Sequence, residues 1–99
     1  MSPEPPVPTT VTPFPGDGEM ARLCRDLDWS RTPLGPVEEW PEALLTTCRL
    51  VLASPLSMVL RWGPDLVQIY NDAYRPLLGA KHPGGLGIPV RECWPEVWA

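Results

Sequence analysis

Few residues of this sequence have side chains suited to catalysis or metal binding. The chain contains one histidine, His82, and three widely spaced cysteines, Cys24, Cys48 and Cys93. No Cys-x-x-Cys pair occurs, and a structural zinc ion needs a set of suitably spaced Cys or His ligands, so we expect no zinc site. A Ser-His-Asp triad cannot be assigned around a single histidine. We expect three reduced and mostly buried thiols.

The acidic residues follow the pattern of helix caps and solvated faces rather than that of acid–base pairs. Those considered are Asp17, Asp26, Asp28, Glu38, Glu39 and Glu42. The formal net charge is −4, whereas nucleic-acid binding needs a basic surface. The sequence therefore predicts no nucleic-acid partner.

Five tryptophans lie at connectors and helix ends, and they lack the basic neighbours that base stacking requires. They are Trp29, Trp40, Trp62, Trp94 and Trp98. Residues 29–40 contain prolines and a glycine that exclude a long helix. We expect Trp29, Leu34 and Trp40 to pin this connector to the domain surface.

The length of 99 residues suffices for one small domain. No apolar run is long enough to cross a bilayer. The N-terminus also lacks the basic and apolar regions of a secretory signal. We therefore expect a cytoplasmic protein without a membrane partner.

Residues 1–16, MSPEPPVPTTVTPFPG, are rich in proline and threonine and predict a disordered tail. A polyproline ligand for an SH3-like partner is the alternative for this segment. Residues 17–56 predict an N-terminal helical flanking segment, and residues 57–99 predict a separate core.

Two helices are predicted within the flanking segment. Asp17 is the candidate cap of the first, which spans Gly18 to about Asp28. The second opens at Trp40-Pro41-Glu42, where proline costs no hydrogen bond, and ends at Ser54-Pro55. The expected buried stripes are Met20, Leu23, Cys24 and Leu27 in the first helix and Leu44, Leu45, Cys48, Val51 and Leu52 in the second.

The stretch MVLRWGPDLVQIYNDAYRPLLG, residues 58–79, predicts a strand, a tight turn, a second strand and a capped helix. Gly63-Pro64-Asp65 supply the turn, and the second strand runs from Leu66 to Tyr70. Gln68 marks the wet face of that strand. The expected buried face is Met58, Leu60 and Trp62 in the first strand and Val67 and Ile69 in the second.

Asn71 is a favoured N-cap for the helix that follows, and Asp72 places negative charge on its first turn. Pro76 conflicts with a regular α-helix, so the helix begins as a 3₁₀ turn or starts later. Gly79 is a natural C-terminal stop.

The loop AKHPGGLGIP, residues 80–89, predicts irregular and mobile backbone because it is rich in glycine and proline. Residues 90–94 predict one helical turn. Trp94-Pro95-Glu96 repeats the chemistry of a helix start, so another helix is expected to begin at Pro95.

The order of these elements resembles the first half of a PAS domain. The segment IYNDAYRPLLG resembles that family's pattern of a strand, an asparagine and a short helix ending in glycine. The segments WGPDLVQIYNDAY, LGAKHPGGLG and ECWPEVW resemble the variant near the N-terminus of bacterial sensor histidine kinases. Those proteins often carry a preceding segment like DWSRTPLGPVEEWPEALLTTCRLVLASP, so the resemblance covers roughly residues 18–98.

The resemblance implies an α+β fold in which a five-stranded antiparallel sheet and its helices enclose a small, mostly apolar pocket. This chain is expected to hold an incomplete PAS-like fold: N-terminal helices, an antiparallel two-stranded hairpin and short helices, with the remaining strands missing. Residues 57–99 are then a truncated PAS-like core. Two strands alone are marginal in water, and we expect the outer edge of the second strand to stay unpaired.

The implied pocket is lined by Met58, Leu60, Tyr70, Tyr74, Leu77, Leu78 and Trp94, which alternatively fill the core. A small apolar ligand is the implied partner of the intact domain, and no cofactor is expected. Some PAS sensors bind haem through histidine, but His82 lies in a Lys-His-Pro-Gly loop and is expected to be solvated. RECWPEV does not match the Gly-x-Asn-Cys-Arg-Phe-Leu-Gln motif of light-sensing members, so Cys93 is expected to be an inert thiol.

The resemblance predicts a sensory or regulatory PAS-type module of a bacterial two-component signal transduction protein, present as a fragment without kinase segments. No enzyme activity is expected, because its intact relatives autophosphorylate on a histidine elsewhere in the polypeptide. The expected partner is a second copy or a downstream kinase domain. The alternatives are a dimerisation or interaction module that binds no ligand, and a cofactor-binding photoreceptor or gas sensor.

Overall fold

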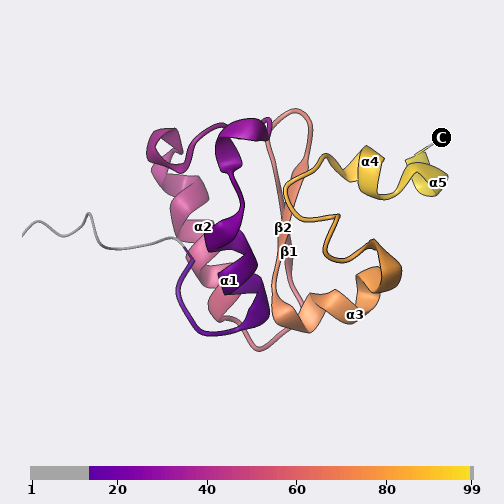
Figure 1. Cartoon of the computed structure of the whole chain (residues 1–99), viewed down its shortest axis with the longest axis horizontal. Coiled ribbons are helices and arrows are strands. Elements are labelled where there is room, and N and C mark those ends of the chain that lie inside the picture. The colour runs from indigo at the N-terminus through magenta and orange to yellow at the C-terminus, as the bar shows by residue number, and fades with distance from the viewer. Residues whose placement is uncertain (1–13, 99) are drawn as a thin grey trace, which may run out of the picture.

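The chain folds around one antiparallel hairpin, with helices on both sides of it (Figure 1). The computed structural model describes residues 14–98. The hairpin consists of β1 (Val59–Trp62) and β2 (Val67–Tyr70). Helices α1 (Glu19–Asp26) and α2 (Glu42–Ala53) lie on one side, and α3 (Arg75–Leu78), α4 (Val90–Cys93) and α5 (Pro95–Trp98) lie on the other. The predicted α+β class, with N-terminal helices, a two-stranded antiparallel hairpin and short helices, is confirmed.

Helices α1 and α2 bury the faces that apolar spacing predicts. The buried members are Met20, Cys24, Leu44, Cys48 and Val51, and Leu23, Leu27, Leu45 and Leu52 pack against them. Helix α2 ends at Ala53, directly before the C-cap Ser54, as expected. Within residues 14–98, no helix has the length and apolar character needed to cross a membrane.

The start of α1 differs from the prediction. Gly18, not Asp17, is the N-cap, and it offers no side chain to the free N–H groups of the first turn. The capping carboxylate comes from a residue distant in sequence, because the backbone N–H of Met20 donates to Asp72 Oδ1 at 3.0 Å. The N-terminus of α1 is therefore fixed by tertiary contact rather than by its own sequence.

Two tryptophans pin the connector between α1 and α2, as predicted. Trp29 begins the 3₁₀ helix η2 (Trp29–Arg31), and its Nε1–H donates to the Cys24 carbonyl at 2.8 Å. Trp40 follows the 3₁₀ helix η3 (Val37–Glu39), and its Nε1–H donates to the Gly35 carbonyl at 2.8 Å. Both rings are buried, and they meet edge to face with centroids 5.1 Å apart.

Phe14 extends this aromatic cluster. Its ring is buried and lies 5.9 Å from the ring of Trp29 and 5.8 Å from that of Trp40. Arg25 Nη1 donates to the Phe14 carbonyl at 2.6 Å. The prediction of a disordered tail over residues 1–16 is therefore wrong at Phe14, while residues 1–13 lie outside the described part of the chain.

The hairpin has a regular antiparallel register in which Leu60 pairs with Ile69 and Arg61 pairs with Gln68. All four residues of β2 are buried. The placement of Gln68 on a wet face is therefore wrong. Its side chain is satisfied inside the fold, since Nε2 donates to the Gly85 carbonyl at 3.2 Å and Oε1 accepts from Arg61 Nε at 3.3 Å.

The outer edge of β2 is paired, contrary to expectation. The Gln68 N–H donates to the Ile88 carbonyl at 3.1 Å, and its carbonyl accepts from the Gly87 N–H at 2.9 Å. Val67 and Pro89 also form an antiparallel bridge. Residues 87–89 of the 79–89 loop thus pair with the edge of β2 that two strands alone would expose.

The segment after β2 follows the prediction around Pro76. A 3₁₀ helix, η4 (Asp72–Tyr74), precedes α3, which places Pro76 in its first turn, where the missing N–H costs no bond. Gly79 ends α3 with φ 55°, a left-handed value that favours glycine. The 3₁₀ helix η5 (Gly79–Lys81), α4 and α5 complete the described fold, with α4 and α5 at the two predicted helix starts.

Candidate functional site: a polar network between helix α1 and the 79–89 loop

Asn71 is the structural junction beside the site. Its side chain is almost fully buried, at 1% exposed. Nδ2 lies 2.9 Å from the Val51 carbonyl and 2.7 Å from the Leu56 carbonyl, and Oδ1 accepts from the N–H groups of Met58 and Tyr74, both at 3.1 Å. The cap on η4 was predicted from the sequence. The same amide also fastens the end of α2 and the start of the hairpin, which the sequence did not indicate.

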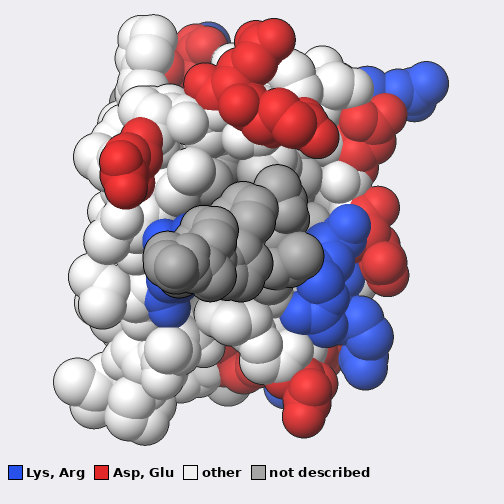
Figure 2. Space-filling view, turned by 90° about the vertical axis from the view of Figure 1, so that its left-hand side faces the viewer, with Lys and Arg blue, Asp and Glu red and all other residues white. Residues whose placement is uncertain are grey.

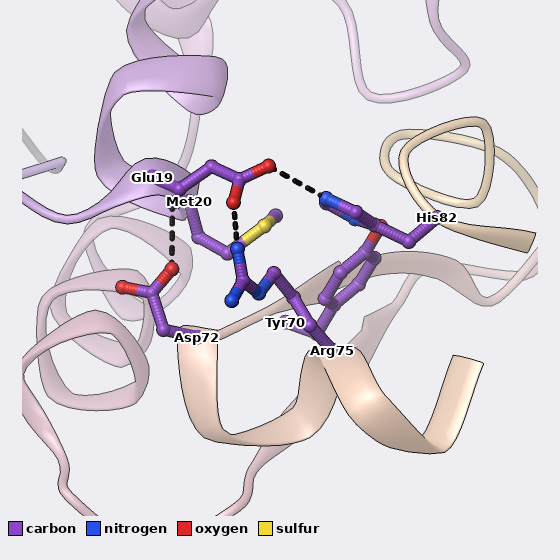
Figure 3. A network of polar contacts seen from close by, with 6 residues as sticks. All are labelled: Glu19, Met20, Tyr70, Asp72, Arg75 and His82. Atoms are coloured by element: carbon purple, nitrogen blue, oxygen red, sulfur yellow. Dashed lines mark hydrogen bonds and ion pairs between the residues drawn. The ribbon is translucent and has the colours of Figure 1, made fainter. Parts of the chain in front are cut away.

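A second cluster of polar side chains joins α1 to the opposite side of the fold (Figure 3). Glu19, in the first turn of α1, pairs with Arg75 of α3 through one carboxylate oxygen. The other oxygen lies 2.9 Å from Nε2 of His82. Nδ1 of His82 in turn lies 2.8 Å from the hydroxyl of Tyr70 at the end of β2. The network therefore connects α1, β2, α3 and the 79–89 loop.

Asp72 completes the site on the other side of α1. It caps the helix through the Met20 N–H, as Figure 3 also shows. Gly18 makes this approach possible, because a methyl group at Gly18 would overlap Asp72 Oδ2. The negative charge of Asp72 lies at the positive end of the α1 dipole, an arrangement that stabilises the helix.

His82 is not the solvated loop residue that was predicted. Its side chain is 15% exposed, and both ring nitrogens are engaged. Burial lowers the pKa of His82 below its usual range, and the nearby Arg75 guanidinium lowers it further, while Asp72 acts in the opposite direction. Glu19 accepts from Nε2 of His82 with one carboxylate oxygen and pairs with Arg75 through the other. The imidazole is therefore held in its neutral form near neutral pH.

The three thiols are free and buried, as expected. Burial raises the pKa of Cys24 to about 12, with a further contribution from Cys48, and burial raises the pKa of Cys48 to about 12. A thiol that stays protonated is a poor nucleophile and a poor metal ligand. Within residues 14–98, no group of three or more His, Cys, Asp and Glu side chains is arranged to hold a metal ion.

The predicted pocket-lining residues are divided between interior and surface. Leu60, Tyr70 and Leu78 are buried, Tyr74 and Trp94 are partly buried, and Met58 and Leu77 are exposed. A hollow of about 620 Å³ lies elsewhere in the described part, with Phe14, Arg25 and Trp29 in its wall. A ligand pocket formed by the seven residues therefore stays a prediction, although the surface positions of Met58 and Leu77 do not favour an enclosed cavity.

Comparison of the chain with protein-family models, with curated proteins and with solved structures gives no match. The geometry therefore carries the functional argument. In this network, both ring nitrogens of His82 already have hydrogen-bond partners. The arrangement can couple the protonation state of His82 to the contacts among α1, β2, α3 and the 79–89 loop.

The network was missed at the sequence level for a simple reason. Its contacts join residues 52 positions apart in the case of Met20 and Asp72 and 63 positions apart in the case of Glu19 and His82. Local spacing carries no signal at that separation. The one usable hint is that the lone histidine follows a short segment that carries both Asp72 and Arg75.

Proposed function

We propose that the chain is a sensory or regulatory PAS-type module of a bacterial two-component signal transduction protein. The single observation that supports this function best is the network of Glu19, Arg75, His82 and Tyr70. It ties the loop beside the hairpin to α1, so a change at the loop has a direct physical route to the N-terminal helix. Such a route between a sensing segment and an output helix is what a regulatory module requires.

The order of elements is a second support. A hairpin, an asparagine-capped short helix and a glycine-rich loop follow one another as in the family that the sequence resembles. We propose a cytoplasmic location and a non-catalytic role, in which the module regulates a kinase domain or pairs with a second copy. A small apolar ligand is a further proposed partner.

The regulatory role is tested by following histidine phosphorylation in the source cells. Cells that carry Asn71→Ala, which dismantles the junction beside the site, are compared with cells that carry Arg31→Ala, whose side chain is 84% exposed. We expect only Asn71→Ala to change the phosphohistidine level of a kinase. Unchanged phosphorylation in both strains contradicts the two-component role. Phosphorylation of the purified chain by ATP alone would contradict the non-catalytic role.

A dimerisation or interaction module is the second candidate, and exposed leucines favour it. Leu50 of α2 is 64% exposed, Leu56 is 71% exposed and Leu77 of α3 is 62% exposed. Large apolar side chains on the surface are a feature of contact sites when they gather into a patch. Sedimentation of the purified chain at two concentrations tests this function. Association that is abolished by Leu50→Ser supports it, and a monomer at both concentrations contradicts it.

A further inference from the structure

The hydrogen bonds of His82 assign its tautomer. A neutral imidazole has one donor and one acceptor. Nε2 faces the carboxylate of Glu19, which only accepts when ionised, so Nε2 carries the proton. Nδ1 is then the acceptor and receives the hydroxyl proton of Tyr70 at 2.8 Å. The neutral ring thus satisfies both of its neighbours.

Protonation of Nδ1 removes the acceptor that the neutral ring offers to the Tyr70 hydroxyl. The charged imidazolium is a donor at both nitrogens, so the Tyr70 hydroxyl would have to accept from Nδ1 and turn its own hydrogen elsewhere. Tyr70 is fully buried, and within residues 14–98 its hydroxyl has no hydrogen-bond partner besides His82. Ionisation of Tyr70 offers no escape, because burial raises its pKa well above the usual range. A buried donor would be left unpaired.

The charges around the ring add to this cost. Arg75 of α3 opposes a second positive charge, while Asp72 of η4 favours it. Glu19 of α1 is already paired with Arg75. Of two further groups, Lys81 pairs with Glu96 at 3.0 Å, and burial keeps the Cys24 thiol protonated. The balance on His82 favours the neutral form.

His82 is one of several points at which the 79–89 loop meets β2. The others are the Gly87 N–H on the Gln68 carbonyl, the Gln68 N–H on the Ile88 carbonyl, and the Gln68 side chain on the Gly85 carbonyl. All three are hydrogen bonds between neutral groups and do not titrate. His82 is thus the one contact among these four whose strength depends on pH.

We propose that His82 is a proton-dependent latch, in which the neutral imidazole holds the 79–89 loop on β2 and protonation releases it. The latch is a property of the fold and does not require the signalling role proposed above. Acidification below pH 6.5, the ordinary pKa of histidine, therefore loosens the loop first while the hairpin stays formed.

The purified 99-residue chain provides the test, because His82 is its only histidine and its NMR titration is unambiguous. Hydrogen exchange of the backbone N–H groups of Gly87 and Asn71 is followed at the pH values of this titration. The rates are corrected for the pH dependence of intrinsic exchange. We expect Gly87 protection to fall about two- to tenfold as His82 gains its proton, the range for one lost hydrogen bond. The backbone N–H of Asn71, which donates to the Met58 carbonyl at 3.2 Å at the base of the hairpin, should keep its protection.

Two variants test whether protonation of His82 causes the fall in Gly87 protection. In His82→Gln the side chain cannot titrate, so the fall in Gly87 protection should disappear. In Tyr70→Phe the acceptor role of Nδ1 is lost, so the pKa of His82 should rise and the loop should be less protected already at neutral pH. A Gly87 protection that is constant through the His82 titration overturns the proposal. So does a fall that persists in His82→Gln, or an equal fall at Asn71, which would indicate global unfolding.

Discussion

The two polar clusters of this protein differ in chemistry although they meet at neighbouring residues, Tyr70 and Asn71. The Asn71 junction is buried and uses only a neutral amide and backbone groups. The His82 network uses charged side chains, and Glu19 and Arg75 are each 37% exposed. Buried neutral hydrogen bonds are costly to lose and insensitive to pH, whereas half-exposed charged pairs are weaker and respond to pH and salt. The comparison indicates that the Asn71 cluster stabilises the fold, whereas the His82 cluster makes part of that stability depend on pH and salt.

Asn71→Ala should have the largest effect. It removes all contacts of the side-chain amide, among them those to the Val51 and Leu56 carbonyls, and leaves the Met58 N–H without its acceptor, so we expect a loss of about 3–4 kcal/mol in the free energy of unfolding. Urea denaturation monitored by circular dichroism measures this loss. A loss below about 1 kcal/mol would mean that water replaces the amide and that the junction is not the main support.

Gly18→Ala should come next. Its backbone angles suit alanine, so the cost is steric: the new methyl group displaces the Asp72 carboxylate and removes the cap of α1. We expect a loss of about 1–2 kcal/mol, typical of a lost N-cap. Gly84→Ala is the matched control, since its nearest neighbour would be the Lys81 carbonyl at 3.8 Å. Equal stability of the two variants would contradict the capping role of Asp72.

Glu19→Gln should have a smaller effect because the ion pair is partly exposed. We expect a loss of about 0.5–1 kcal/mol at low salt, shrinking as salt is added. Asp26→Asn, on the exposed side of the same helix, is the control for a change of one charge on α1. If both variants lose the same stability, the effect is one of net charge and not of the network.

The smallest effect should be the pH dependence of stability. The folded-state pKa of His82 lies below its unfolded value of about 6.5, so the unfolded chain binds the proton first as pH falls. The stabilisation is therefore fully present above that unfolded value and decreases as pH falls through it toward the folded value. Urea midpoints between pH 7.5 and 5.5 should decrease more in the natural chain than in His82→Gln. Identical slopes would indicate that His82 titrates alike in both states.

Much of the fold was readable because its signals are local. The apolar stripes of α1 and α2, the break at Pro76 and the stop at Gly79 each depend on a few neighbouring residues. The predictions that were wrong depend on contacts between residues that are distant in the sequence. Gln68 looked solvent-facing because alternation describes one strand and not the loop that covers it.

The site was predicted less well than the fold. Asn71 was identified as a cap, but its bonds to α2 join residues up to 20 positions apart. The Lys-His-Pro-Gly setting of His82 predicts a solvated residue, because such sequences are typical of exposed loops. Only the tertiary packing of the loop on β2, through Gly87 and Ile88, brings the ring to Tyr70 and Glu19.

The side-chain amide of Asn71 contacts the end of α2, the turn after it, the residue before β1 and the 3₁₀ helix η4. Because one side chain bonds to all four segments, we expect them to unfold together as one cooperative unit. The 79–89 loop around His82 is held by separate, weaker contacts. It is then free to open and close many times while the segments joined by Asn71 stay folded.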